Sequence, residues 1–208
     1  MNRHRNILLL LPLLVLLVAC GSGDNYTPKP KGYMRIDLPE PVYSLVDSLS
    51  GDFDSVRFDA KLLPFSFEAN EGTHIELKKN ERRLKWVDIR YPDLNGIIFL
   101  SYIPIRNLND LAGEVDTSYL LVSKHFGFAS GISENKFVNK AENVYATSYQ
   151  LKGQNVASTY QFWATDSVSH FLRGSLYIDC VPNNDSLAPV LEYLQHDMVH
   201  LIETLKWR

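Results

Sequence analysis

The chain begins with a segment of the kind that is removed before folding, and this determines where the folded part can start. Residues 3–5 are basic, and residues 7–18 are apolar almost throughout. The apolar run ends in Leu-Val-Ala-Cys at residues 17–20. A Leu-x-Ala-Cys ending after such a run is typical of a bacterial lipobox, where the chain is cut before the cysteine and acyl chains are attached to it. We therefore predict a signal peptide over residues 1–19 and lipidation of Cys20.

An ordinary secretory signal and a single membrane helix are the two alternatives for this segment. The apolar run is shorter than the about 20 residues that cross a bilayer comfortably. Several acyl chains on one residue give a lasting anchor, because each buried methylene contributes about 0.8 kcal/mol. We expect everything after Cys20 to work outside the cytoplasm, tied to a membrane surface.

Composition limits what the remaining chain can do. Cleavage would remove 19 of the 208 residues and leave 189, enough for a sizeable core. Losing Arg3 and Arg5 lowers Lys plus Arg from 21 to 19 against 24 acids, a net charge of about −5, which argues against nucleic-acid binding. With Cys20 acylated, Cys180 is the one thiol left, so a disulfide within the chain is excluded.

The part after the cysteine divides into a tether and a folded domain. Residues 20–32 carry small and polar residues with Pro28 and Pro30, which favour extended geometry, and we predict a tether there. Residues 33–208 are predicted to be a single globular domain. We expect residues 43–67 to be irregular with short edge strands.

Alternation of apolar and polar residues predicts most of the strands. In the first half, strands are expected around residues 75–77, 87–91 and 97–103, with a turn at 92–96. The period then changes to that of a helix over residues 107–126, with a capping box at Asn107 and Asp110 and with Gly127 at the C-terminal end. In the second half, strands are expected at 145–151, 156–165 and 171–181, followed by a helix over 185–206.

This succession predicts an α+β fold, with one antiparallel sheet flanked by helices 107–126 and 185–206. By analogy alone, the last three strands and the helix resemble the α/β/α sandwich of the PsbP and Mog1 families.

One helical stretch resembles a metal motif. His196 and His200 are four residues apart, so they would share a helix face and could bind zinc, with Asp197 between them as a general base. The predicted buried stripe of the same helix faces the other way, which places both histidines with Glu203 and Trp207 on the outer face. This leucine stripe consists of Leu187, Leu191, Leu194, Met198, Leu201 and Leu205. We favour a solvated or partner-facing pair over a zinc site.

Arg173 lies in the densest polar and aromatic stretch, residues 170–177. One interpretation is an anion site, and the other is that Arg173 covers neighbouring aromatic rings and pairs with Asp179 or another acid. We favour the second. Cys180 falls on the apolar face of the strand, where an inert cysteine is expected. Motifs for phosphate, dinucleotide or serine-hydrolase chemistry are absent from the sequence, so we expect no cofactor, no small-molecule substrate and no enzyme activity.

Two stretches resemble the gliding motility lipoprotein GldD family. The first is YTPKPKGYMRIDLP at residues 26–39, and the second is HFLRGSLY at 170–177 with NDSLAP at 184–189. The resemblance implies an outer-membrane lipoprotein needed for gliding and for the type IX secretion system that exports adhesins. It implies no catalytic residues, and only the lipid-bearing Cys20 carries over as a site.

We therefore expect a non-enzymatic component that acts through protein contacts, with the periplasm as its compartment. The candidate partner-binding residues are Arg173, His196, His200 and Trp207. For Trp207, packing against its own domain is the competing interpretation. The alternative function is a periplasmic metal-dependent hydrolase that uses His196 and His200.

Overall fold

The computed structural model describes residues 38–47, 63–79 and 85–208. All of them belong to one compact unit, residues 36–208. The predicted signal peptide, Cys20 and the tether lie outside the described residues, so the expected domain boundary at residue 33 stays a prediction.

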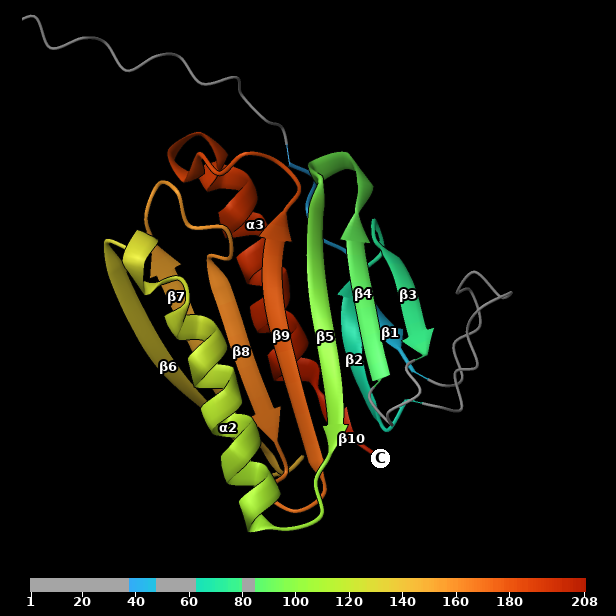
Figure 1. Ribbon diagram of the computed structural model, residues 1–208. Coiled ribbons are helices and arrows are strands. Elements are labelled where there is room, and N and C mark those ends of the chain that lie inside the picture. Colours follow the sequence, from blue (N-terminus) through green and yellow to red (C-terminus); the bar gives the residue numbers. More distant parts are fainter. Residues whose placement is uncertain (1–37, 48–62, 80–84) are drawn as a thin grey trace, which may run out of the picture. The chain divides into compact units, whose positions relative to one another are not determined.

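A seven-stranded antiparallel sheet forms the centre of the fold (Figure 1). Its order is β3-β4-β5-β9-β8-β7-β6, so two meanders meet where β5 pairs with β9. Apolar residues pair across this junction, as Ile98 does with Leu176. The strands are β3 (His74–Lys79), β4 (Lys85–Tyr91), β5 (Gly96–Pro104), β6 (Gly131–Asn139), β7 (Val144–Lys152), β8 (Tyr160–Thr165) and β9 (His170–Ile178).

The turn predicted between β4 and β5 is present, as a short 3-10 helix, η3 (Pro92–Leu94). Asn95 follows it with a φ of 49°, a left-handed conformation that asparagine tolerates better than most residues. Gly96 then starts β5 directly beneath Leu194, whose Cδ1 would lie 2.6 Å from an added Cβ. The Asn-Gly pair therefore serves both the turn and the packing.

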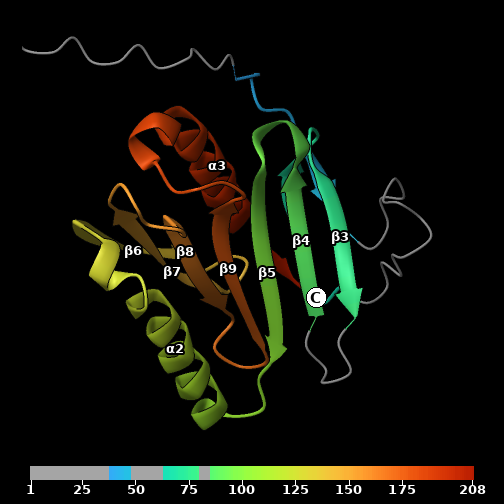
Figure 2. The ribbon, with the colours of Figure 1, turned by 45° about the horizontal axis from the view of Figure 1, so that its top comes forward.

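Two long helices cover opposite faces of the sheet (Figure 1, Figure 2). Strand residues Leu172 and Leu176 share a core with Leu194 and Met198 of α3 (Asn184–Thr204). On the other face, Tyr149 and Leu151 pack with Val122 of α2 (Leu108–Ser123). The predicted α+β class, with an antiparallel sheet flanked by helices, is confirmed.

The ends of α2 test the predicted caps. The Asn107 side chain accepts a hydrogen bond from the Asp110 N–H at 2.9 Å, as a capping residue should. The return bond of a capping box goes elsewhere, because the Asp110 carboxylate accepts from the N–H of Arg106. The expectation for Gly127 was wrong, since α2 ends at Ser123 and Gly127 lies inside a separate 3-10 helix, η4 (Phe126–Phe128).

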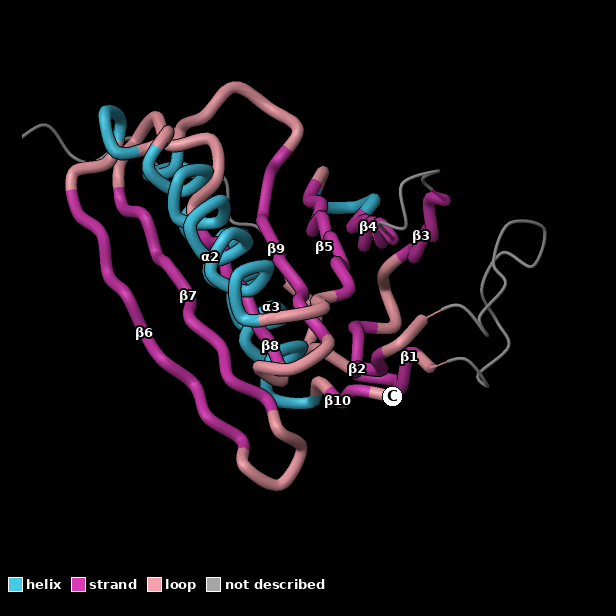
Figure 3. Tube along the Cα trace, turned by 60° about the horizontal axis from the view of Figure 1, so that its bottom comes forward, coloured by secondary structure: helices cyan, strands magenta, loops and turns pink. Residues whose placement is uncertain are grey.

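A second, three-stranded sheet lies beside α3 (Figure 3). Its central strand carries Phe65 and Phe67, both fully buried in the core that α3 also shares. The strands are β1 (Tyr43–Val46), β2 (Phe65–Asn70) and β10 (Lys206–Trp207), in the order β1-β2-β10. The face of the large sheet that carries α3 is therefore covered by a helix and a small sheet together.

Two sequence expectations need correction. The second half contributes four strands to the sheet rather than three, because β6 was not predicted. The helix predicted over 185–206 ends at Thr204, and Lys206 and Trp207 leave it to form β10.

Candidate functional site

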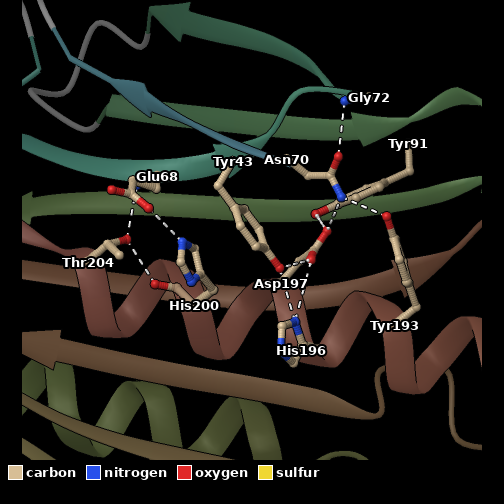
Figure 4. Close-up of polar contacts among 10 residues, drawn as sticks. All are labelled: Tyr43, Glu68, Asn70, Gly72, Tyr91, Tyr193, His196, Asp197, His200 and Thr204. Carbon is tan, nitrogen blue, oxygen red and sulfur yellow. Dashed lines mark hydrogen bonds and ion pairs between the residues drawn. The ribbon is translucent and has the colours of Figure 1, made fainter. Parts of the chain in front are cut away.

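Four elements converge on the carboxylate of Asp197, which is only 4% exposed (Figure 4). The residue belongs to α3, and its three hydrogen-bond donors come from β1, β2 and β4. Its Oδ1 accepts from the Tyr43 hydroxyl at 2.6 Å. Its Oδ2 accepts from Asn70 Nδ2 and from the Tyr91 hydroxyl, each at 3.0 Å. A buried charge of this kind is tolerated because several donors replace the water that it loses.

The cluster extends from Asp197 on both sides. Asn70 Nδ2 also donates to the Tyr193 hydroxyl at 2.8 Å, and its Oδ1 accepts from the N–H of Gly72 at 3.0 Å. Tyr193 precedes Asp197 by one helical turn, so both reach the same side of α3. The side chain of Asn70 thus connects α3 with the turn that follows β2.

The tyrosine protons in this cluster are strongly held. Burial and then the adjacent Asp197 raise the pKa of both Tyr43 and Tyr91 well above the ordinary value. The Tyr43 hydroxyl donates its hydrogen bond to Asp197, so its oxygen can accept one from Nδ1 of His196, 3.0 Å away. A neutral tyrosine that donates to a carboxylate is a stable arrangement at neutral pH, and it binds the elements together rather than exchanging protons.

His200 forms a second cluster one turn further along α3. Its Nε2 lies 2.7 Å from Oε2 of Glu68 on β2, and the ring of Tyr43 stacks on the imidazole with centroids 3.7 Å apart. Thr204 Oγ1 accepts from the Glu68 N–H at 3.0 Å and donates to the carbonyl of His200 at 2.8 Å. Helix and strand are thus joined by both side-chain and backbone groups.

The structure corrects the outer-face placement of His200, whereas His196 is exposed as expected. β1 and β2 pack against that side of α3, so the His200 side chain is only 24% exposed, while that of His196 is 66% exposed. Asp197, placed between them as a general base in the metal interpretation, points into the protein and is shielded from solvent. Within residues 38–47, 63–79 and 85–208, no group of three or more His, Cys, Asp or Glu side chains is arranged to hold a metal ion.

Trp207 also differs from its predicted place, since it lies in β10 and not on α3. Its ring stacks on His170 with centroids 5.2 Å apart and meets Phe65 edge-on. Its Nε1 donates to the carbonyl oxygen of Asn143 at 3.2 Å. The side chain is partly buried, so the residue packs against its own domain.

Arg173 lies on the opposite face of the sheet, toward α2. Its Nη2 donates to Oε1 of Gln161 on the neighbouring strand at 2.6 Å, and burial lowers the pKa of its guanidinium. The predicted pairing was with Asp179 or another acid, but the ion pairs of the described residues do not include Arg173, and its partner here is the Gln161 amide. The four candidate partner-binding residues therefore do not form one surface. His196 and His200 are neighbours, Trp207 lies beside His170, and Arg173 is separated from them by the sheet.

The Asp197 cluster was not predicted from the sequence. Tyr43, Asn70 and Tyr91 stand in three different strands, and no motif connects them to α3. The available signal was an acid on α3 at helical spacing from the buried residues Val190 and Leu194, although this alone names no partners.

Comparison with known proteins shows the family of the chain. A family model described as gliding motility lipoprotein GldD matches residues 23–207 of the chain. The chain belongs to the GldD family. The match covers nearly all of the sequence that follows the predicted lipidation site, which agrees with the resemblance seen in the two short stretches. A search of curated proteins gave no match.

Membership of the GldD family makes this a gliding motility lipoprotein, and membrane attachment through a lipid follows from the family. Neither α2 nor α3 could cross a membrane, and the same holds for every helix in the described part of the chain.

Proposed function

We propose that the protein is a non-enzymatic structural or assembly component of the gliding machinery and of the associated type IX secretion system. It is anchored in the outer membrane through acyl chains on Cys20 and faces the periplasm. Its partners are other proteins of this machinery, and it takes neither nucleic acid nor a small-molecule substrate. The observation that carries the proposal is the family match over residues 23–207.

The geometry of the polar clusters supports a structural role. Both carboxylate oxygens of Asp197 are used to hold β1, β2 and β4 to α3. A general base needs an accessible lone pair that points toward a substrate, whereas this carboxylate is buried and fully engaged. His200 is likewise occupied by Glu68 and Tyr43.

The proposed leaflet rests on the residues that follow Cys20. Only Asp24 lies close behind it, whereas the surface-export signal of such bacteria is a cluster of acids. A lipoprotein without that cluster stays on the periplasmic leaflet of the outer membrane.

Partner contacts are proposed at Arg173, His196, His200 and Trp207. The His196 side chain is 66% exposed, against 24% for that of His200. Arg173 and Trp207 are partly buried. His196 is therefore the residue most available to another protein. The other three would contribute by shaping the surface around them.

The anchor and the role can be tested in one experiment. Cys20→Ala, Cys180→Ser and the wild type are each expressed in a strain that lacks the protein. Acyl labelling, membrane fractionation, spreading on agar and adhesin export are then measured. We expect Cys20→Ala to lose acyl labelling and outer-membrane retention, and with them spreading and export, whereas Cys180→Ser behaves as the wild type. Normal acyl labelling of Cys20→Ala would contradict the anchor.

The hydrolase alternative is tested with a double variant, His196→Gln with His200→Gln. Glutamine keeps polar contacts but removes both imidazoles, so we expect a folded protein that supports spreading and export. Loss of function in a folded, lipidated double variant would favour the metal enzyme.

A further inference from the structure

Strand β6 is an open edge of the seven-stranded sheet. It pairs with β7 alone, and no described element lies beyond it (Figure 3). It is nine residues long and contains no proline. Its apolar residues Ile132 and Val138 are 43% and 55% exposed, and Glu134 and Lys136 between them are exposed as well. Long edges of this kind attract further strands unless something blocks them.

The backbone groups that β6 turns outward can be identified from its neighbours. The N–H of Leu151 on β7 donates to the carbonyl oxygen of Thr159, which lies just before β8 in the chain. Leu151 therefore bonds toward the β8 side. Along an antiparallel strand, successive residues direct their N–H and C=O to opposite sides. Ser148 and Gln150 therefore bond toward β6, where they pair with Asn135 and Ser133. The residues of β6 that direct N–H and C=O toward a further strand are Ile132, Glu134, Lys136 and Val138.

The side chains of these four residues would match those of a second, antiparallel copy of β6 in charge and in apolar character. If a second β6 lies antiparallel with Asn135 opposite Asn135, then Ile132 faces Val138 and Glu134 faces Lys136, each pair occurring twice. All of these side chains stand on one face of the sheet, because they are two residues apart. Apolar and opposite-charge pairs directly across a strand pair are stabilising. Lys136, which would repel a basic strand, meets an acid in this arrangement.

We propose that two copies of this chain associate through β6, antiparallel about a two-fold axis at Asn135, to form one continuous sheet. Such an interface uses the same patch on both subunits, so it closes at the dimer and leaves β6 with no further free edge. The inference is independent of the proposed function, because it rests on the exposed edge and its charge pattern alone.

The test combines a disulfide reporter with charge reversal, in the full chain expressed in cells with Cys180 replaced by Ser. Across the two-fold axis the Asn135 pair is a close one without backbone hydrogen bonds, with Cα atoms about 4.5 Å apart, within disulfide range. Asn135→Cys should therefore give a crosslinked dimer under mild oxidation. Ser133→Cys is the control, because its symmetry mate lies about four residues away along the strand, roughly 13 Å, and should give little.

Charge reversal then tests whether the crosslink depends on pairing of Glu134 with Lys136 of a second copy. In the Asn135→Cys background, Glu134→Lys places lysine opposite lysine, and Lys136→Glu places glutamate opposite glutamate. Each should reduce crosslinking about tenfold. The double swap Glu134→Lys with Lys136→Glu restores opposite charges and should restore the dimer. Co-expression of the two single variants should also restore crosslinking, as a mixed dimer.

Several outcomes would overturn the proposal. They are equal crosslinking at positions 133 and 135, no crosslinking at 135 in the wild-type background, or crosslinking that survives both single reversals. Capture of a different protein by Asn135→Cys, without a self-dimer, would assign β6 to that partner instead. Unchanged thermal unfolding of the single variants confirms that a loss of dimer is not a loss of fold.

Discussion

The hydroxyl of Tyr43 donates to the carboxylate of Asp197 at 2.6 Å, although the two residues are 154 positions apart. Tyr43 begins the first described strand, and Asp197 lies within the last helix. The same ring stacks on His200, so one side chain docks β1 onto α3 through two different interactions. The position of β1, the first described strand, therefore depends on α3, which lies near the end of the chain.

The first prediction concerns this hydrogen bond. Tyr43→Phe keeps the ring on His200 but removes a donor from the buried carboxylate. We expect the free energy of unfolding to fall by about 1–3 kcal/mol. Tyr119→Phe is the control, since Tyr119 is 52% exposed, and it should change stability by less than about 0.5 kcal/mol. Urea unfolding measures both, and equal effects would contradict the assigned role of Tyr43.

The second prediction concerns alkaline pH. Burial and Asp197 raise the pKa of Tyr43 and Tyr91 in the folded protein. A raised pKa means that the folded state keeps these protons when the unfolded chain begins to lose them, near pH 10. Stability should therefore be full below about pH 10 and decline above it. In Tyr91→Phe the decline should be shallower, which unfolding measured between about pH 8 and pH 11 would show. An identical pH dependence in wild type and variant would count against the raised pKa.

The third prediction compares two positions on α3. Leu194 is fully buried, so Leu194→Ala should cost about 2–5 kcal/mol. The His196 side chain is 66% exposed, and His196→Ala should stay within about 0.5 kcal/mol. Denaturant unfolding of the two variants gives the comparison, and similar losses would mean that the helix faces have been assigned wrongly.

The fourth prediction concerns glycine in β9. A Cβ at Gly174 would overlap the ring of Phe162, which is itself 1% exposed and has no room to move. Gly174→Ala should therefore destabilise the fold by about 1–3 kcal/mol. At Gly113 in α2 nothing lies within 4 Å of an added Cβ, so Gly113→Ala should raise stability by about 0.5–1 kcal/mol. Thermal melting distinguishes these opposite signs.

The fifth prediction concerns Trp207. Because the ring packs on His170 and Phe65, Trp207→Ala should cost about 1–3 kcal/mol, less than a fully buried aromatic. Its neighbour Lys206 makes a surface ion pair with Glu142 at 3.1 Å, and Lys206→Ala should cost at most about 1 kcal/mol. Should Trp207→Ala leave stability unchanged yet abolish assembly, the residue would be a partner contact after all.

The regular part of this fold could be predicted because its apolar residues recur with the period of a strand or of a helix. Leu172 and Leu176 of β9 show the expected strand period, and Leu194, Met198 and Leu201 of α3 show the expected helix period. The structure places all five in one core. β6 escaped prediction for the opposite reason. Ile132 and Val138 are exposed and separated by polar residues, so no periodic apolar signal marks the strand.

The polar cluster could not be predicted, because its members are joined only by tertiary structure. The helical periodicity gave α3 a single buried side, but β1 and β2 cover another side and enclose Asp197 and His200. That second covering comes from two short strands. β2 does alternate between apolar and polar residues, but the alternation does not show that its polar residues Glu68 and Asn70 face α3. Buried polar groups that satisfy one another leave little trace in a hydrophobic pattern.

Strand β2 lies between β1 and β10, so the small sheet is complete only when the final residues of the chain are in place. Lys206 pairs with Ser66, and the N–H of Arg208 donates to the carbonyl of Pro64 at 2.8 Å. In a chain that emerges from a membrane with its N-terminus first, β2 can pair with β10 only after almost the whole sequence has emerged. Such long-range pairing slows folding. The last three residues thus hold β2 in place, and a truncation or fusion there would also weaken the pairing of β1 with β2.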